Sequence, residues 1–93
     1  MTDYHPPVKR SIEIAGHKTS ISLEPAFWDL LRQEANRQDI PLNALVATID
    51  EERIRAETPP GLAGAIRQWL LHRLMENHDN GKIFLPDQSI SKI

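Results

Sequence analysis

The sequence predicts a mainly α fold that carries a short β-ribbon. Polar and apolar residues alternate from Arg10 to Leu23, three later stretches show the i, i+3, i+4 spacing of amphipathic helices, and proline- or glycine-containing turns separate these stretches. The 93 residues, 40 % of them hydrophobic, suit one small domain. A domain of this size buries only about 60–65 % of its unfolded surface, so we expect it to associate with a second copy.

The stretch 10–23 is predicted to be β structure. Its large aliphatic residues alternate with polar residues on both sides of a turn at Gly16-His17: Ile12, Ile14, Ile21 and Leu23. Two interpretations stay open here. Residues 10–15 form a separate strand of a hairpin, or they lead directly into a single strand.

Three helices are predicted after the strands. Pro25 suits the first turn of a helix over 25–38, and a turn at 38–41 separates this helix from a second one over 41–56. The breaker Thr58-Pro59-Pro60-Gly61 precedes a third helix over 61–77, which turn-forming residues then end. Residues 82–86 are read as a short strand or an apolar tail.

Two stretches resemble a known family. Residues 18–31 (KTSISLEPAFWDLL), continued by 42–46 (LNALV), resemble the ribbon-helix-helix family of bacterial DNA-binding proteins. Residues 10–24 (RSIEIAGHKTSISLE), followed by Phe27-Trp28, are similar to a group of short bacterial proteins predicted to bind DNA. The resemblance implies a sequence-specific DNA-binding protein, most simply a transcriptional regulator.

The resemblance also implies an organisation for the chain. Residues 1–8 form a flexible arm, 9–58 the ribbon-helix-helix domain, 59–77 an additional helix packed on the core, and 78–93 a C-terminal tail. Two chains form an intertwined homodimer, in which each contributes one strand to a two-stranded antiparallel ribbon that enters the major groove of double-stranded DNA. A lone strand with unpaired N–H and C=O groups independently favours such pairing.

The resemblance assigns base reading to Lys18, Ser20 and Ser22, which point away from the helices if Ile21 and Leu23 point toward them. It assigns phosphate contacts to residues flanking the ribbon and to the start of the second helix: Lys9, Arg10, His17 and Asn43. The start of that helix departs from the family pattern, because Pro41 removes a donor and Asp39 adds a negative charge.

The resemblance places seven apolar residues in the dimer core: Ile21, Leu23, Phe27, Leu31, Leu45, Val46 and Ile49. The third helix is predicted to extend this core through its apolar residues. A docking surface for a partner protein is the alternative for that helix.

Several other classes of function are excluded. The chain has no cysteine, and its four histidines lack metal-ligand spacing. No nucleophile elbow or P-loop is present, and the consecutive carboxylates Asp50-Glu51-Glu52 point in different directions on a helix. We therefore expect no enzyme activity, no cofactor and no metal. No apolar run approaches a membrane span of about 20 residues, so we expect a cytoplasmic protein without membrane contact.

Two alternatives to a DNA-binding regulator stay open. In antitoxins with this fold, the C-terminal region wraps a toxin, and the apolar residues 83–85 here suggest a possible protein partner through 61–93. Alternatively, the scaffold has lost DNA binding, as the net charge of −2, the two serines on the reading face and Pro41 at the start of the second helix indicate. The acidic stretch 24–58, with a net charge of −4, would repel a polyanion unless it faces away.

Overall fold

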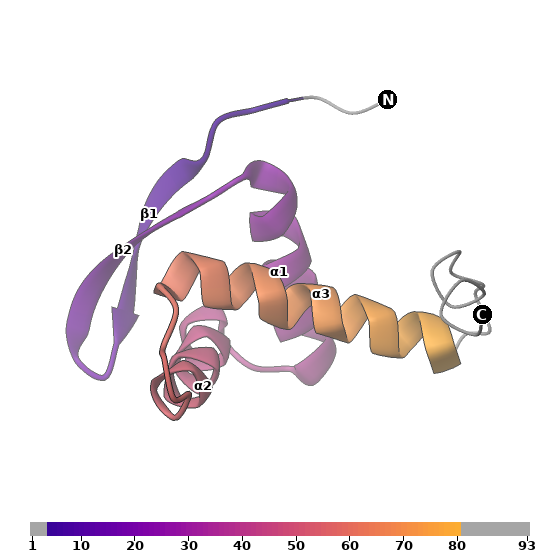
Figure 1. Ribbon diagram of the computed structural model, residues 1–93. Helices are drawn as coiled ribbons and strands as arrows, with labels where there is room; N and C mark the ends of the chain where they lie inside the picture. The colour runs from indigo at the N-terminus through magenta and orange to yellow at the C-terminus, as the bar shows by residue number, and fades with distance from the viewer. Residues whose placement is uncertain (1–3, 81–93) are drawn as a thin grey trace.

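A two-stranded antiparallel hairpin opens the fold, followed by three helices (Figure 1). This computed structural model describes residues 4–80. Strand β1 spans Val8–Ile14 and strand β2 spans His17–Leu23, and they pair in register from Val8 opposite Leu23 to Ile14 opposite His17. Residues 10–15 therefore belong mostly to a separate strand, which begins at Val8. The apolar segment 82–86 lies outside the described residues.

The hairpin turns at Ala15-Gly16, one residue earlier than the predicted Gly16-His17. Ala15 has φ +52° and Gly16 has φ +81°. Positive φ at both residues of a two-residue loop is the geometry that matches the twist of the paired strands. The turn was misplaced because alanine, unlike asparagine or aspartate, does not signal such a conformation in a sequence.

Replacing Ala15 with Asn is expected to raise the free energy of unfolding by about 0.5–1 kcal/mol, because Asn adopts positive φ at lower cost than alanine. Urea unfolding of the full chain measures the change. Gly16→Ala is the matched control: a Cβ at Gly16 would meet no atom within 4 Å, so only backbone strain acts, and stability should fall by about 1 kcal/mol. A loss of stability in Ala15→Asn would contradict the turn geometry.

Helices α1 and α2 follow the hairpin. Helix α1 spans Pro25–Gln38, as predicted, and ends at Asp39, whose φ of +59° closes the last turn. Helix α2 spans Leu42–Ile54, shorter than the predicted 41–56. Pro41 caps its N-terminus in an extended conformation, and the chain bends away into the loop beyond Arg55.

Helix α3 spans Leu62–Asn80, longer than the predicted 61–77. Gly61 precedes its first turn and accepts the N–H of Ala65 through its carbonyl at 2.9 Å. The turn-forming residues after the predicted end do not stop the helix, which continues to Asn80. Among the described residues, none of the helices has the length and apolar character needed to cross a membrane.

The core lies between one face of the hairpin and the helices, with α2 against β1 and α3 against β2. Ile21 and Leu23 from β2 are buried beside Leu31 of α1. Helix α3 completes this core with Ile66 and Leu70, which are 0 % and 3 % exposed. The third helix is therefore packed on the core.

Candidate nucleic-acid interface

Alternation along the two strands gives the hairpin two chemically different faces. The inner face carries Ile12 and Ile21, which are buried against the helices. The outer face consists of three polar residues from each strand: Lys9, Ser11, Glu13, Lys18, Ser20 and Ser22. All of these are exposed except Ser22, which is half-buried. The outer face is thus a polar surface on a two-stranded ribbon.

The predicted base-reading residues all lie on this outer face. The register places Ser20 opposite Ser11, Ser22 opposite Lys9, and Lys18 opposite Glu13. Opposite side chains in an antiparallel pair lie close together, so Lys18 and Glu13 have complementary charges at one end of the face. Sequence reasoning did not assign Ser11 or Glu13 to the interface, since the pairing of residues 10–15 stayed open; their alternation with Ile12 and Ile14 was the available signal.

The four predicted phosphate-contacting residues lie in different settings. Lys9 belongs to the outer face itself, and His17 is exposed beside the turn. Arg10 lies on the opposite face, where its guanidinium carbon is 5.5 Å from the centroid of the Trp28 ring. Asn43 is exposed at the start of α2 and donates through Nδ2 to the Glu13 carbonyl at 3.4 Å.

The hydrogen bond from Asn43 to the Glu13 carbonyl brings the start of α2 next to β1. Helix α2 has no side-chain cap, and Pro41 accepts the N–H groups of Ala44 and Leu45 through its carbonyl, at 3.1 and 3.2 Å. The first N–H groups of a helix carry partial positive charge and can bind an anion. Asn43 therefore joins this helix start to the ribbon end that holds Glu13.

Trp28 fixes β1 to α1. Its indole Nε1 donates to the Val8 carbonyl at 2.9 Å, while its ring is 1 % exposed and supports Arg10. A buried indole with its N–H satisfied and a cation over its face is a strong local anchor. Trp28 is thus a core residue that positions the ribbon.

The seven residues predicted for the dimer core are mostly buried within a single chain. Six are no more than 2 % exposed: Ile21, Leu23, Leu31, Leu45, Val46 and Ile49. Phe27 is half-buried and lines a groove of about 200 Å³ with Arg67, Gln68, Leu71 and Leu74. Ala65, Ile66 and Leu70 of α3 belong to the same buried cluster, and the part of the seven predicted residues in a dimer core stays a prediction.

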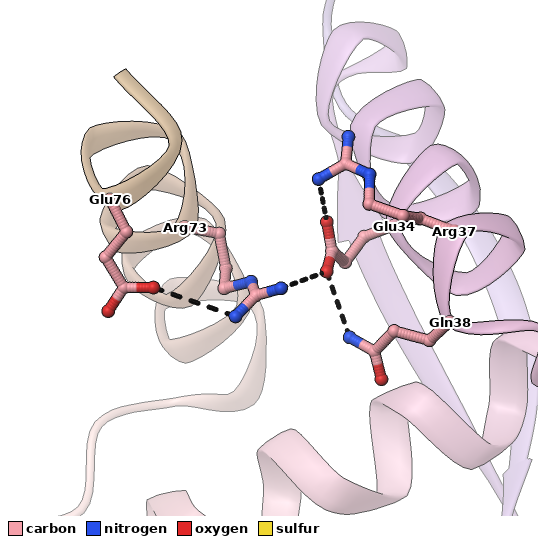
Figure 2. A network of polar contacts seen from close by, with 5 residues as sticks. All are labelled: Glu34, Arg37, Gln38, Arg73 and Glu76. Carbon is pink, nitrogen blue, oxygen red and sulfur yellow. Dashed lines mark hydrogen bonds and ion pairs between the residues drawn. The ribbon is translucent and has the colours of Figure 1, made fainter. Parts of the chain in front are cut away.

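A buried carboxylate holds α3 on α1 (Figure 2). Glu34 is 4 % exposed and accepts from Arg37 at 2.9 Å, from Gln38 at 3.0 Å and from Arg73 of α3 at 2.7 Å. Burial raises the pKa of Glu34, but the hydrogen bonds from Gln38 and Arg73 and the charges of Arg73 and Arg37 outweigh it, so the net pKa is lowered. Arg73 also approaches Glu76 at 3.6 Å.

A second ion pair joins α3 to the junction between β2 and α1. Arg67 Nη2 lies 3.0 Å from Glu24 Oε1. Hydrogen bonds to the Glu24 carboxylate, from the Glu24 backbone N–H and from Arg67, lower the pKa of Glu24. Among the side chains that the structure describes, no three His, Cys, Asp or Glu residues gather in a way that could hold a metal ion. The ion pairs Glu24–Arg67 and Glu34–Arg73 connect α3 to the start and to the body of α1.

The comparisons with known proteins agree with this architecture. The family described as the ribbon-helix-helix domain matches residues 7–74, which include the hairpin, α1, α2 and most of α3. The comparisons with curated proteins and with solved structures gave no match. Members of the matched family typically bind DNA and are not enzymes. Because the match covers well over half of the sequence and the hairpin and helices occur in the expected order, the chain belongs to the ribbon-helix-helix domain family.

Proposed function

We propose that the protein is a sequence-specific DNA-binding protein and acts as a transcriptional regulator in the cytoplasm. The observation that carries this proposal is the exposed polar outer face on a two-stranded ribbon, in a chain of a family whose members typically bind DNA. Lys18, Ser20 and Ser22 read base edges in this proposal. Binding alone is the mechanism, with no reaction and no cofactor.

The dimensions of the ribbon support the proposal. Two paired strands lie about 4.8 Å apart, and the B-DNA major groove, about 12 Å wide, admits a two-stranded ribbon. The groove displays a distinct donor and acceptor pattern for each base pair. Lys18 donates to guanine O6 or N7, whereas the hydroxyls of Ser20 and Ser22 donate or accept and so discriminate less sharply.

The distribution of charge supports the same orientation. The hairpin carries Lys9, Arg10 and Lys18 against Glu13, a net charge of +2, whereas residues 24–58 carry −4. DNA would be attracted to the ribbon and repelled by the acidic surface. In the proposed complex Lys9 contacts a phosphate beside the groove and Asn43 contacts one at the start of α2. Arg10 and His17, which the register places on the inner face of the hairpin, would have to reach phosphates around its edge.

We also propose that the protein acts on DNA as a homodimer. The family binds DNA as dimers, and α3 exposes three large apolar side chains, Leu71, Leu74 and Met75, which are 54, 36 and 41 % exposed. Leu71 and Leu74 line the same groove as Phe27. In this arrangement a second copy covers these residues. An intertwined dimer, with strands paired between chains, is the form that the family resemblance implies.

The apolar surface on α3 also favours a second candidate function. A protein partner bound there, through residues 61–93, would make the chain an interaction module with weak or no DNA binding. Leu71→Glu tests the dimer: light scattering of the full chain should show a dimer for the wild type and a monomer for the variant. Glu57→Gln, a charge change at an exposed site in the loop between α2 and α3, should leave the dimer intact. A wild-type monomer would contradict the dimer and favour the interaction module.

The base-reading role is tested with the triple variant Lys18→Ala, Ser20→Ala, Ser22→Ala. Its affinity for a DNA site selected by the wild type should fall at least about tenfold, toward the affinity for unrelated DNA, because good base contacts each contribute about 1–3 kcal/mol of discrimination. Fluorescence anisotropy with both duplexes measures this. The control Arg55→Ala removes one positive charge from the far end of α2 and should keep the preference. An unchanged preference in the triple variant would refute reading by these residues.

A further inference from the structure

We infer that the cavity between helices α2 and α3 binds a small organic ammonium ion with an apolar body. The cavity has a volume of about 230 Å³ and is lined by both helices and by the loop that joins them. It lies at the C-terminal half of α2, whereas the start of that helix contacts the ribbon through Asn43. The inference goes beyond the proposed DNA binding and does not rest on it.

Helical periodicity brings the lining residues of each helix onto one face. Positions i, i+3, i+4 and i+7 are neighbours along the same side of a helix. The lining residues have this spacing twice, once along α2 and the turn after it and once along α3: Ile49, Glu52, Arg53 and Ala56, and Ala65, Gln68, Trp69 and His72. Since the two alanines carry only a methyl group, the two faces approach each other without filling the space between them.

Part of the lining is apolar and aromatic. Ile49 is 2 % exposed and Ala65 is 9 % exposed, and the half-buried Trp69 contributes an indole ring. A cavity of about 150 Å³ holds a benzene molecule, so this cavity has room for one aromatic ring with a short chain. The face of an indole attracts a cation, and the guanidinium carbon of Arg73, which does not line the cavity, already lies 5.5 Å from the centroid of the Trp69 ring.

The charge of the lining favours a cation over an anion. Arg53 lines the cavity, but its charge is balanced by Asp50, whose Oδ1 accepts from Arg53 Nε at 2.8 Å. Glu52, by contrast, forms no ion pair with any residue that the structure describes. The carboxylate of Glu52 is therefore the uncompensated charge of the lining, and an ammonium group would pair with it.

The cavity is preformed, because both of its sides are fixed. Arg53 Nη1 donates to the Pro60 carbonyl at 3.0 Å and so ties the connecting loop to α2. Helix α3 is held by the buried Ile66 and by the ion pair between Glu34 and Arg73 at 2.7 Å. A site that is already ordered loses little conformational freedom when a ligand binds.

Three probes of similar size separate the charge of the ligand from its apolar body. Each carries a phenyl ring on a two-carbon chain: phenethylamine is a cation, 2-phenylethanol is neutral and 3-phenylpropanoate is an anion. We expect the full chain to bind phenethylamine with a Kd of about 1 mM or less, and at least about fivefold more tightly than the other two probes. Equal binding of the three probes, or no saturation by phenethylamine at about 10 mM, would overturn the inference.

The two tryptophans report where the probe binds. Trp69 lines the cavity, whereas Trp28 is 1 % exposed and its indole N–H donates to the Val8 carbonyl. The ¹H–¹⁵N spectrum of the labelled chain has one indole signal for each, and Trp69→Phe assigns them. Phenethylamine should shift the Trp69 signal progressively, which gives the Kd, and leave the Trp28 signal in place. Saturable binding without a shift of the Trp69 signal would place the probe elsewhere and overturn the inference.

Glu52→Gln tests the carboxylate, because it keeps the size of the side chain and removes its charge. The affinity for phenethylamine should fall about three- to fivefold, as expected for an exposed ion pair, while the affinity for 2-phenylethanol stays the same. Glu51→Gln is the matched control: Glu51 is the neighbouring exposed carboxylate of α2 and does not line the cavity. Unchanged binding in Glu52→Gln, or an equal loss in Glu51→Gln, would overturn the pairing with Glu52.

Ala56→Leu tests the cavity itself. Ala56 is exposed, so the larger side chain should leave the fold intact, which circular dichroism verifies, and should occupy part of the space that the ligand needs. The affinities for phenethylamine and for 2-phenylethanol should both fall at least about fivefold. Unchanged binding of phenethylamine by Ala56→Leu would show that the probe binds outside the cavity and would overturn the inference.

Discussion

Replacing Ile66 with Ala is expected to lower the free energy of unfolding by about 2–5 kcal/mol. Ile66 is 0 % exposed and lies in the core between α3 and the hairpin, so its truncation removes buried methyl and methylene groups and leaves a cavity. Urea unfolding of the full chain, followed by circular dichroism, measures the change. The result matters because it shows whether α3 belongs to the cooperative core.

Ile54→Ala is the matched control for this substitution. Ile54 ends α2 and is 58 % exposed, so the same chemical change should cost less than about 0.5–1 kcal/mol. Equal losses for the two variants would contradict the packing of α3 on the hairpin. A loss of less than about 1 kcal/mol in the free energy of unfolding of Ile66→Ala would show that the core forms without α3.

Replacing Glu34 with Gln is expected to destabilise the fold by about 1–3 kcal/mol at pH 7, because Arg73 loses its buried charged partner across the α1–α3 contact. The folded-state pKa of Glu34 is lowered, so its contribution is present above its unfolded pKa and is lost as the pH falls through the folded value. The difference between wild type and Glu34→Gln should therefore shrink as the pH is lowered from 7 to below 4.

Glu57→Gln is the control for this pH dependence, because Glu57 is exposed beyond the end of α2. Its stability should follow that of the wild type at each pH. Urea unfolding at several pH values measures the free energy of unfolding of the wild type and of both variants. A difference between wild type and Glu34→Gln that stays constant with pH would contradict an ionised, hydrogen-bonded Glu34.

The sequence predicted the helices better than the pairing of the strands. Helix α1 has the predicted bounds because Pro25 marks its start and the turn after Gln38 marks its end. Alternation correctly assigned Ile21 and Leu23 to the inner face and Ser20 to the outer face. Alternation carries no information about which edge of a strand is paired or by which chain, so the β1–β2 pairing stayed open.

Contacts between distant residues could not be predicted from patterns along the chain. Glu34 and Arg73 are 39 residues apart, and neither stands out among the other charged residues of its helix. Packing, which depends on how α3 crosses α1, decides that Glu34 is buried while Leu71 is exposed.

A random-oligonucleotide selection with the purified full chain tests the central claim most directly, since it measures binding and sequence preference together. We expect one enriched motif, bound with a log–log salt slope of about −4 to −5 if two chains together neutralise about 4–6 phosphates. The same selection with Lys18→Ala, Ser20→Ala, Ser22→Ala should lose the motif. No enrichment by the wild type, or a motif that survives the triple substitution, would contradict DNA reading by the outer face of the hairpin.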